Sequence, residues 1–578
     1  MIIDNIQLDL FKSGVEKPVQ AKPGYDGDML DSVLSHVGDM GRYQKVLYVA
    51  MIPFGFIYAF TYFVQMFITV APQNYWCRVP ELAGLSMELR RNLSAPGADT
   101  GIWDHCMTFD TNWTEVLNTL TPPPSGTPLI KCQNGWEFEF KDIPYETVAT
   151  EREWVCDRAN YVPIAQSLFF TGSVAGGFLF GWIADRFGRV PALVGTNLVG
   201  GLGGIATVFT TGLWDFILCR FLVGMSFDNC FMIVYILVLE YIGPKYRTFA
   251  ANSAFGFSFG GGAIALPWIA YFIADWRIFI WVTSLPMFIA LLAPWILPES
   301  TRWLVSIGHV DKAVEVLRSF EKFNKLKIPD NVMDEFVVSS NKAKLEKKQT
   351  LITLMKSPRM CMAFVGLVVV HLGCNVVFDG LVRLSDSFGL DFFLTFCLNS
   401  VTELPANFIL AVVLDRLGRR NLTWAPLVLS GLFITIAIFV TDGASQAGLA
   451  IVARFFINIS YTVTMQWCVE ILPTPFRATG SGALHLVGYF GIIVTPFIVY
   501  SERYWSLLPL VTFAITAYVS GAITLGLPET KGQPMPQTIA DGEKIIREQS
   551  LCGNIKDVEE NNKESSVDPG SYKTSHHI

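Results

Sequence analysis

Four ionisable residues lie inside long apolar stretches of the sequence, where charged side chains are rare. They are Asp228, Asp379, Glu403 and Arg454. A charge is costly in hydrocarbon, so an ionisable residue at such a position usually faces a polar cavity or an ion partner. Three carboxylates around one cavity would attract a positively charged small molecule, because Coulomb attraction is strong at low dielectric. The pattern predicts reversible binding of a cation and requires no covalent step.

Each acid could instead form an internal ion pair, for example with Arg454. One interior base cannot neutralise three acids, and Arg454 is the one evident base inside these stretches. Arg454 itself could pair with an acid or bind a substrate carboxylate. The sequence therefore predicts a cation or zwitterion as ligand, with an organic anion bound by Arg454 as the alternative.

Aromatic residues make up 13% of the chain and could form part of the same site. Phe378 precedes Asp379, and Tyr489 could offer an ammonium group its ring face and a hydroxyl donor. Most other aromatic residues should pack against helices or lipid. His371 and His485 also lie in apolar stretches and could carry protons, although packed, hydrogen-bonded histidines are the expected case.

The stretches that carry these residues are long enough to cross a bilayer. Apolar residues form 51% of the chain and charged residues 16%, whereas a soluble domain carries roughly 25% charged residues. Twelve runs of about 20 apolar residues recur along the chain, each long enough to span the hydrocarbon layer. The sequence predicts an all-α membrane protein with twelve transmembrane helices.

Three polar clusters recur in register across the two halves of the chain, each 230 positions after its first copy. Asp185-Arg186-Phe187-Gly188-Arg189 returns as Asp415-Arg416-Leu417-Gly418-Arg419, Glu240 and Arg247 return as Glu470 and Arg477, and Leu297-Pro298-Glu299-Ser300 returns as Leu527-Pro528-Glu529-Thr530. Repetition at a fixed offset indicates an internal repeat. Two parallel copies of a six-helix unit resemble the major facilitator architecture.

Arginine and lysine are concentrated in the loops on one side of the predicted spans, and that side should be cytoplasmic. The opposite short loops hold scattered cations such as Arg277, Arg383 and Arg503. An even number of spans then places both termini in the cytoplasm. The predicted segments are a cytoplasmic N-terminal segment 1–45, a first six-helix lobe 46–297 that contains an extracellular loop 72–160, a cytoplasmic linker with short helices 298–357, a second six-helix lobe 358–527 and a disordered cytoplasmic tail 528–578.

The repeated charges at the cytoplasmic helix ends predict a gate. Asp185 and Asp415 stand at the entry to the next helix, where a carboxylate could cap free N–H groups. The arginines that follow could bridge to acids on neighbouring helices and hold the inner gate shut; the alternative is that they only signal topology. The predicted gating residues are Asp185, Arg186, Arg189, Glu240, Arg247, Asp415, Arg416, Arg419, Glu470 and Arg477.

The long outer loop has the features of an extracellular segment. Four cysteines in an oxidising space predict two disulfides with three possible pairings; they are Cys77, Cys106, Cys132 and Cys156. Two glycosylation sequons begin at Asn92 and Asn112. The loop shows no catalytic triad, metal-ligand spacing or phosphate-binding motif, so we expect no enzyme activity, metal or cofactor.

Several passages resemble the organic cation, anion and carnitine transporter family of the major facilitator superfamily. They are EREWVCDRANYVPIAQSLFFTGSVAGGFLFGWIADRFGR, LEYIGPKYRT, PESTRWLVSIGHVDKAVEVL, ELPANFILAVVLDRLGRR and LPETKG. Glu403 matches a glutamate of the cation-carrying members, whereas Asp379 and Asp228 replace neutral residues. Tyr489 stands where cation carriers have an acid and anion carriers a base. The passage SFDNCFMIVYILVLEY is similar to the insect carcinine and β-alanine transporter branch.

The resemblance implies a plasma-membrane carrier that works by alternating access. Its expected substrates are small amines or zwitterions such as carcinine, β-alanine or carnitine, and transport could be coupled to sodium or protons. The rivals are an organic anion carrier that uses Arg454 and a membrane receptor that reads its ligand with the outer loop.

Overall fold

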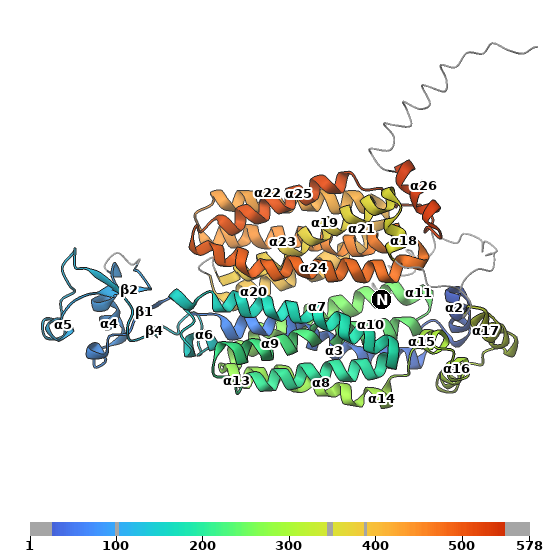
Figure 1. Ribbon diagram of the computed structural model, residues 1–578, viewed down its shortest axis with the longest axis horizontal. Helices are drawn as coiled ribbons and strands as arrows, with labels where there is room; N and C mark the ends of the chain where they lie inside the picture. The colour runs from blue at the N-terminus through green and yellow to red at the C-terminus, as the bar shows by residue number, and fades with distance from the viewer. Residues whose placement is uncertain (1–25, 99–102, 344–350, 387–389, 550–578) are drawn as a thin grey trace, which may run out of the picture.

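The computed structural model describes residues 26–98, 103–343, 351–386 and 390–549. In this part of the chain, twelve helices are long and apolar enough to cross a membrane. They form two lobes that lie side by side (Figure 1). This arrangement confirms the predicted all-α membrane fold.

The helices of the first lobe come from the first half of the chain, and the span that ends with α12 passes through a π-helical turn at Phe255–Gly260. The helices are α3 (Arg42–Thr69), α7 (Tyr161–Phe187), α8 (Arg189–Thr207), α9 (Leu213–Phe227), α10 (Asn229–Tyr241), α11 (Pro244–Ala254), α12 (Gly261–Ile273), α13 (Trp276–Ser284) and α14 (Ala293–Ile296).

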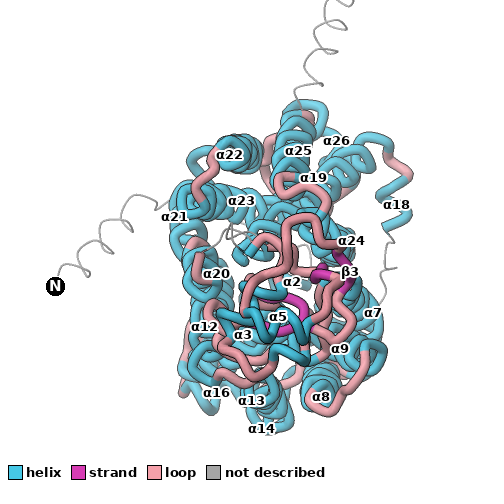
Figure 2. Tube along the Cα trace, turned by 90° about the vertical axis from the view of Figure 1, so that its left-hand side faces the viewer, coloured by secondary structure: helices cyan, strands magenta, loops and turns pink. Residues whose placement is uncertain are grey.

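The second lobe repeats this arrangement in the second half of the chain. Its helices are α19 (Pro358–Arg383), α20 (Phe392–Val401), α21 (Glu403–Leu417), α22 (Arg419–Phe439), α23 (Gly443–Ile471), α24 (Arg477–Tyr500) and α25 (Leu508–Leu525). The lobes meet where α7 packs against α24 and where α12 packs against α20, and Figure 2 shows these two seams on opposite sides of the end-on view.

Two of the predicted site residues lie at interruptions of membrane helices. Asp228 separates α9 from α10, and Glu403 opens α21 directly after the break at Thr402. Within the first lobe, small residues allow close packing: a Cβ on Gly176 would lie 1.9 Å from the carbonyl oxygen of Met225. The interior acids are thus carried by tightly packed helices.

One end of the molecule, which we call the loop end, carries a small folded region (Figure 1). Its antiparallel strand pairs are β1 (Tyr75–Cys77) with β4 (Trp136–Phe138) and β2 (Met107–Phe109) with β3 (Leu129–Lys131). Its helices are α4 (Met87–Ser94), α5 (Trp113–Thr119) and α6 (Val148–Glu151). The disulfides are Cys77–Cys132 and Cys106–Cys156, one of the three possible pairings.

The opposite end, which we call the linker end, carries short helices (Figure 1). They are α2 (Asp26–Val37), α15 (Thr301–Ser306), α16 (Val310–Asn324), α17 (Asp330–Ala343), α18 (Leu351–Met355) and α26 (Ile539–Gln549). Helix α26 corrects the prediction of a disordered tail from residue 528. It packs against α19, where the Ser357 hydroxyl donates a hydrogen bond to Glu543. Residues 1–25 and 550–578 lie outside the described part.

Candidate functional site

A cavity of about 40 Å³ lies between the lobes near the middle of the membrane helices. It holds about three water molecules and is too small for an organic cation. A substrate therefore fits only after the lobes move apart. The lining residues are Tyr58, Tyr62, Phe227, Phe255 and Phe259 from the first lobe, and Asn375, Phe378, Glu403, Asn407, Asn458, Tyr461, Thr462, His485, Tyr489 and Ile492 from the second.

Asp228 joins the two lobes beside this cavity. Its Oδ1 accepts a hydrogen bond of 2.9 Å from the Tyr489 hydroxyl and lies 3.0 Å from His485 Nε2, both on α24. Asp228 is only 8% exposed. Among the described residues, no arginine or lysine lies within ion-pair distance of its carboxylate. Its partners are a phenol and an imidazole, so no permanently charged side chain among the described residues pairs with it.

Asp379 is neutralised by a base that the sequence analysis placed in an outer loop. Arg383, four residues further along α19, is buried, and its Nε lies 2.6 Å from Asp379 Oδ2. The expectation that Arg454 is the one interior base is therefore wrong. Arg220 on α9 is also buried, so the structure has at least three buried arginines. The i,i+4 spacing of Asp379 and Arg383 on one helix was the signal that could have revealed the pair.

The Asp379–Arg383 pair also forms a polar layer across the lobe interface. The Tyr62 hydroxyl donates to Asp379 Oδ1 at 2.8 Å, and Arg383 donates to Gln166 Oε1 at 2.7 Å. Tyr62 and Gln166 belong to the first lobe, and the pair belongs to the second. This layer closes the loop-end side of the cavity.

Glu403 forms the second buried ion pair, at 3.0 Å from Arg454. Arg454 is fully buried and also donates to the carbonyl oxygens of Phe378 and Asn399. Its guanidinium lies 4.1 Å from the centre of the Phe378 ring, which also stacks on Tyr461 at 5.1 Å. Phe378 thus already contacts a cation of the protein itself.

Two glutamates at the linker end cap the helices that follow the repeated motifs. Glu299 accepts hydrogen bonds from the backbone N–H groups of Arg189 and Val190 at 2.7 and 3.1 Å. Glu529 does the same for Arg419 and Arg420 at 2.9 and 3.1 Å. A carboxylate at this position satisfies free N–H groups and meets the positive end of the helix dipole.

The cap predicted from Asp185 is therefore wrong. Asp185 lies in the last turn of α7, its side chain is 79% exposed, and it pairs with Arg189 at 3.0 Å. The side chain of Asp415 lies outside the described part. The repeated Leu-Pro-Glu motif was visible in the sequence, but only the fold shows that its glutamate reaches a helix about 110 residues earlier.

The remaining predicted gating residues make different contacts in the two lobes. Arg419 pairs with Glu470 at 2.9 Å, and Glu470 and Glu240 accept hydrogen bonds from Thr530 and Ser300 respectively. Arg186 and Arg416 are exposed. The predicted bridges thus appear in the second lobe, whereas Arg189 donates to Asp185 and to a backbone carbonyl.

Arg247 and Arg477 occupy equivalent positions but have different surroundings. Arg247 pairs with Asp31 of α2 at 2.6 Å. The Nε and one terminal nitrogen of Arg477 are buried without a hydrogen-bond partner among the described residues. Burial lowers the pKa of Arg477 below its usual value. Arg477 is therefore a cation available for a partner in another arrangement of the lobes.

Two helical lobes around a small interior cavity lined by buried charges are typical of membrane transporters that work by alternating access. The family described as Sugar (and other) transporter matches residues 132–538. The inward-open structure of the xylose transporter XylE from E. coli covers 87% of this chain and 98% of its own, with a TM-score of 0.54 and 15% identity. That likeness concerns the fold alone.

Three relatives with known names indicate which type of membrane transporter this chain is. The carcinine transporter of Drosophila melanogaster is 30% identical, over 89% of this chain and 79% of that protein. Solute carrier family 22 member 1 of Oryctolagus cuniculus is 31% identical, over 90% and 96%. The β-alanine transporter of Drosophila melanogaster is 27% identical, over 90% of both. The chain belongs to the major facilitator superfamily, as a multi-pass secondary transporter of the solute carrier family 22 organic cation type.

Proposed function

We propose that this protein carries a small organic cation or zwitterion across the plasma membrane, and that Asp228 pairs with the positive centre of the substrate. One observation supports the choice of Asp228. Of the three interior acids, Asp379 and Glu403 each hold an arginine, whereas Asp228 holds a tyrosine and a histidine. A substrate cation can replace these two partners without leaving a guanidinium buried and unpaired.

The same contacts link binding to lobe movement. Tyr489 and His485 tie the second lobe to Asp228 of the first. A cation that takes Asp228 removes this tie, and the lobes are then freer to rock about the site. A substrate can shift the equilibrium between two arrangements of the lobes only if it binds one of them more tightly than the other. Competition for Asp228 would give the substrate such a difference in affinity.

The inner gate is proposed to close between α7 and α24. Gly177 of α7 faces Leu486 of α24 across the lobes. Asp185 and Arg477 lie about 12–14 Å beyond this contact toward the linker end, at about 1.5 Å of helix per residue. An exposed carboxylate and an unsatisfied guanidinium at matching heights would pair when the lobes approach at that end.

The substrate is proposed to be an amine or amino acid-like metabolite such as carcinine, β-alanine or carnitine, as the names of two relatives suggest. The linker end and both termini are proposed to be cytoplasmic. Organic anion transport through Arg454 has less support, because this arginine is fully buried and bonded to Glu403 and two carbonyl groups.

Uptake of radiolabelled amines and of a dicarboxylate, in cells with and without external sodium, tests this proposal. Wild-type cells should accumulate at least one cation or zwitterion, and unlabelled cation should compete while dicarboxylate should not. Competition by the dicarboxylate alone would support the anion alternative. Comparison of the two media shows whether sodium drives the flux.

A further inference from the structure

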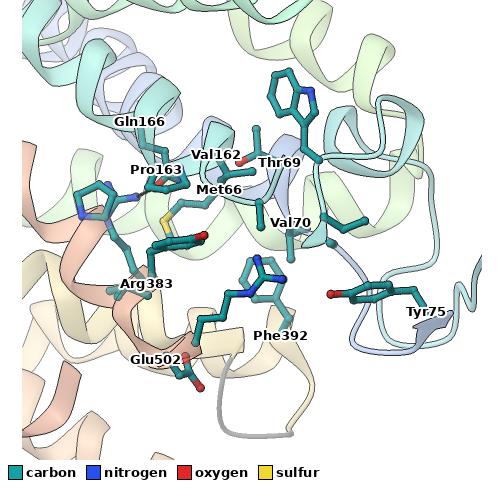
Figure 3. Close-up of a pocket in the computed structure, with 18 residues that line it drawn as sticks. Met66, Thr69, Val70, Tyr75, Val162, Pro163, Gln166, Arg383, Phe392 and Glu502 are labelled. Atoms are coloured by element: carbon teal, nitrogen blue, oxygen red, sulfur yellow. Dashed lines mark hydrogen bonds between the residues drawn. The ribbon is translucent and has the colours of Figure 1, made fainter. Parts of the chain in front are cut away.

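A larger pocket of about 450 Å³ opens between the lobes at the loop end, beyond the Asp379–Arg383 layer. Figure 3 shows Arg383 and Gln166 at one side of it and Tyr75 at the other. We call it the vestibule. Its volume is in the range of small-molecule sites, whereas the central cavity is closed to anything larger than water. A substrate that arrives from the loop end must occupy the vestibule first.

The vestibule is lined by the guanidinium of Arg503, whose contacts with described residues are to neutral groups. Arg503 donates to the carbonyl oxygen of Cys156 at 2.5 Å and contacts Cys106 Sγ at 3.5 Å. Both partners are uncharged, and Arg503 forms no ion pair within the described part of the chain. Its side chain is exposed, so its remaining N–H donors face the vestibule or solvent. An arginine held in place by neutral groups is suited to a carboxylate ligand.

The neighbouring groups are compatible with a carboxylate bound at Arg503. Tyr75 also lines the vestibule, and burial raises the pKa of its hydroxyl although Arg503 lowers it in part, so the phenol stays a neutral donor. Glu502 also lines this pocket. Arg383 at the floor is already bound to Asp379 and Gln166.

We propose that the vestibule is an entry site for zwitterionic, amino acid-like substrates, in which Arg503 binds the carboxylate and the ammonium stays free to reach Asp228. The site lies on the path to Asp228 but is distinct from it, so it would select for a carboxylate before the ammonium reaches the central acid. This inference rests on the proposed transport function and adds to it the carboxylate as a recognised group.

The test compares β-alanine with β-alaninamide, which differ in the carboxylate and share the ammonium. Arg503→Gln should raise the KM for β-alanine uptake about ten-fold, as expected for loss of a charge-assisted hydrogen bond. The KM for β-alaninamide should stay within about two-fold, because a neutral amide gains little from a guanidinium. Arg503→Lys should recover part of the β-alanine affinity.

The matched control is Arg277→Gln, at the same end of the molecule. Arg277 pairs with Glu151 at 2.6 Å and does not line the vestibule. This variant should leave both KM values unchanged. Equal shifts for both probes in Arg503→Gln, or none for β-alanine, would overturn the proposal.

A binding measurement separates the entry site from the transport function. β-Alanine should raise the Tm of the purified wild-type protein at about ten-fold lower concentration than it does for Arg503→Gln, in which Asp228 is intact. β-Alaninamide should act equally on both proteins. Wild-type protein that carries none of the amines or zwitterions tested would refute the transport proposal, while the Tm comparison would still decide the entry site. Absence of any β-alanine effect on the wild-type Tm would refute the entry site.

Discussion

The hydroxyl of Tyr489 donates a hydrogen bond of 2.9 Å to Asp228 across the interface between the two lobes. The family resemblance implies an acid at the position of Tyr489 in cation carriers and a base in anion carriers. The structure places the acid opposite, on the first lobe, and lets the tyrosine bind it. The carboxylate and its partner thus come from different lobes, so any ligand of Asp228 acts on the contact between them.

Neutralising Asp228 should impair cation binding. Asp228→Asn keeps the size of the side chain and its ability to accept from Tyr489, but it removes the charge. We expect the KM for cation uptake to rise about ten-fold or more, or uptake to be lost, since hydrogen bonds to charged groups contribute about 1.5–3 kcal/mol. Surface biotinylation should show normal amounts of the variant. Wild-type kinetics in Asp228→Asn at normal surface level would contradict its role.

Neutralising Glu403 should act mainly on stability. Glu403→Gln leaves the fully buried Arg454 without a counter-charge, and removal of one partner of a buried ion pair costs about 3–5 kcal/mol. We expect a lower Tm of the purified protein and less protein at the cell surface.

The double variant Glu403→Gln, Arg454→Met is the control for that prediction. It removes both charges, so much of the loss in Tm should be recovered. A Glu403→Gln variant with wild-type Tm and altered substrate affinity would instead place this glutamate in the substrate site.

The sequence predicted the twelve helices, the repeat and the interior acids, because hydropathy and a fixed offset are local properties of the chain. It left open the pair that Glu403 forms with Arg454, and it failed on the partners of Asp379 and Asp228. Arg383 was assigned to a loop because it follows an apolar run, yet it is the last residue of α19 and is buried between the lobes. The partners of Asp228 lie about 260 residues away on another lobe, and no local pattern connects them.

The two glutamate caps should contribute similarly to their lobes. Glu299→Gln and Glu529→Gln each weaken two charge-assisted hydrogen bonds at a helix N-terminus. We expect each variant to lose about 1–2 kcal/mol of stability, the usual contribution of a cap, which thermal unfolding of the purified protein should detect. Asp185→Asn is the comparison, because its exposed side chain caps no helix and its Tm should match the wild type. A larger loss of Tm in Asp185→Asn than in Glu299→Gln would contradict the assignment.

The loop end should carry glycans if it is extracellular. Asn92 and Asn112 are exposed in the folded loop region, and Asn112 caps α5. Glycosidase treatment of protein from insect or mammalian cells should increase its mobility on a gel, and Asn→Gln at both positions should remove the shift. A wild-type band that does not respond would argue against the proposed orientation.

The proposed inner gate predicts that Asp185 and Arg477 depend on each other. Asp185→Asn and Arg477→Gln should each slow transport while surface expression stays near normal, because the pair stabilises the state that is closed at the linker end. A partly exposed pair contributes about 0.2–1 kcal/mol, enough to change a lobe equilibrium by a factor of about 1.4 to 5. The charge swap Asp185→Arg with Arg477→Asp should recover more activity than either single reversal. The swap keeps both charges but exchanges their helices, so recovery cannot come from the Asp185–Arg189 contact within the first lobe. If the loss of transport in the double variant equals the sum of the losses in the two single reversals, the two residues act separately. The proposed Asp185–Arg477 gate would then be wrong.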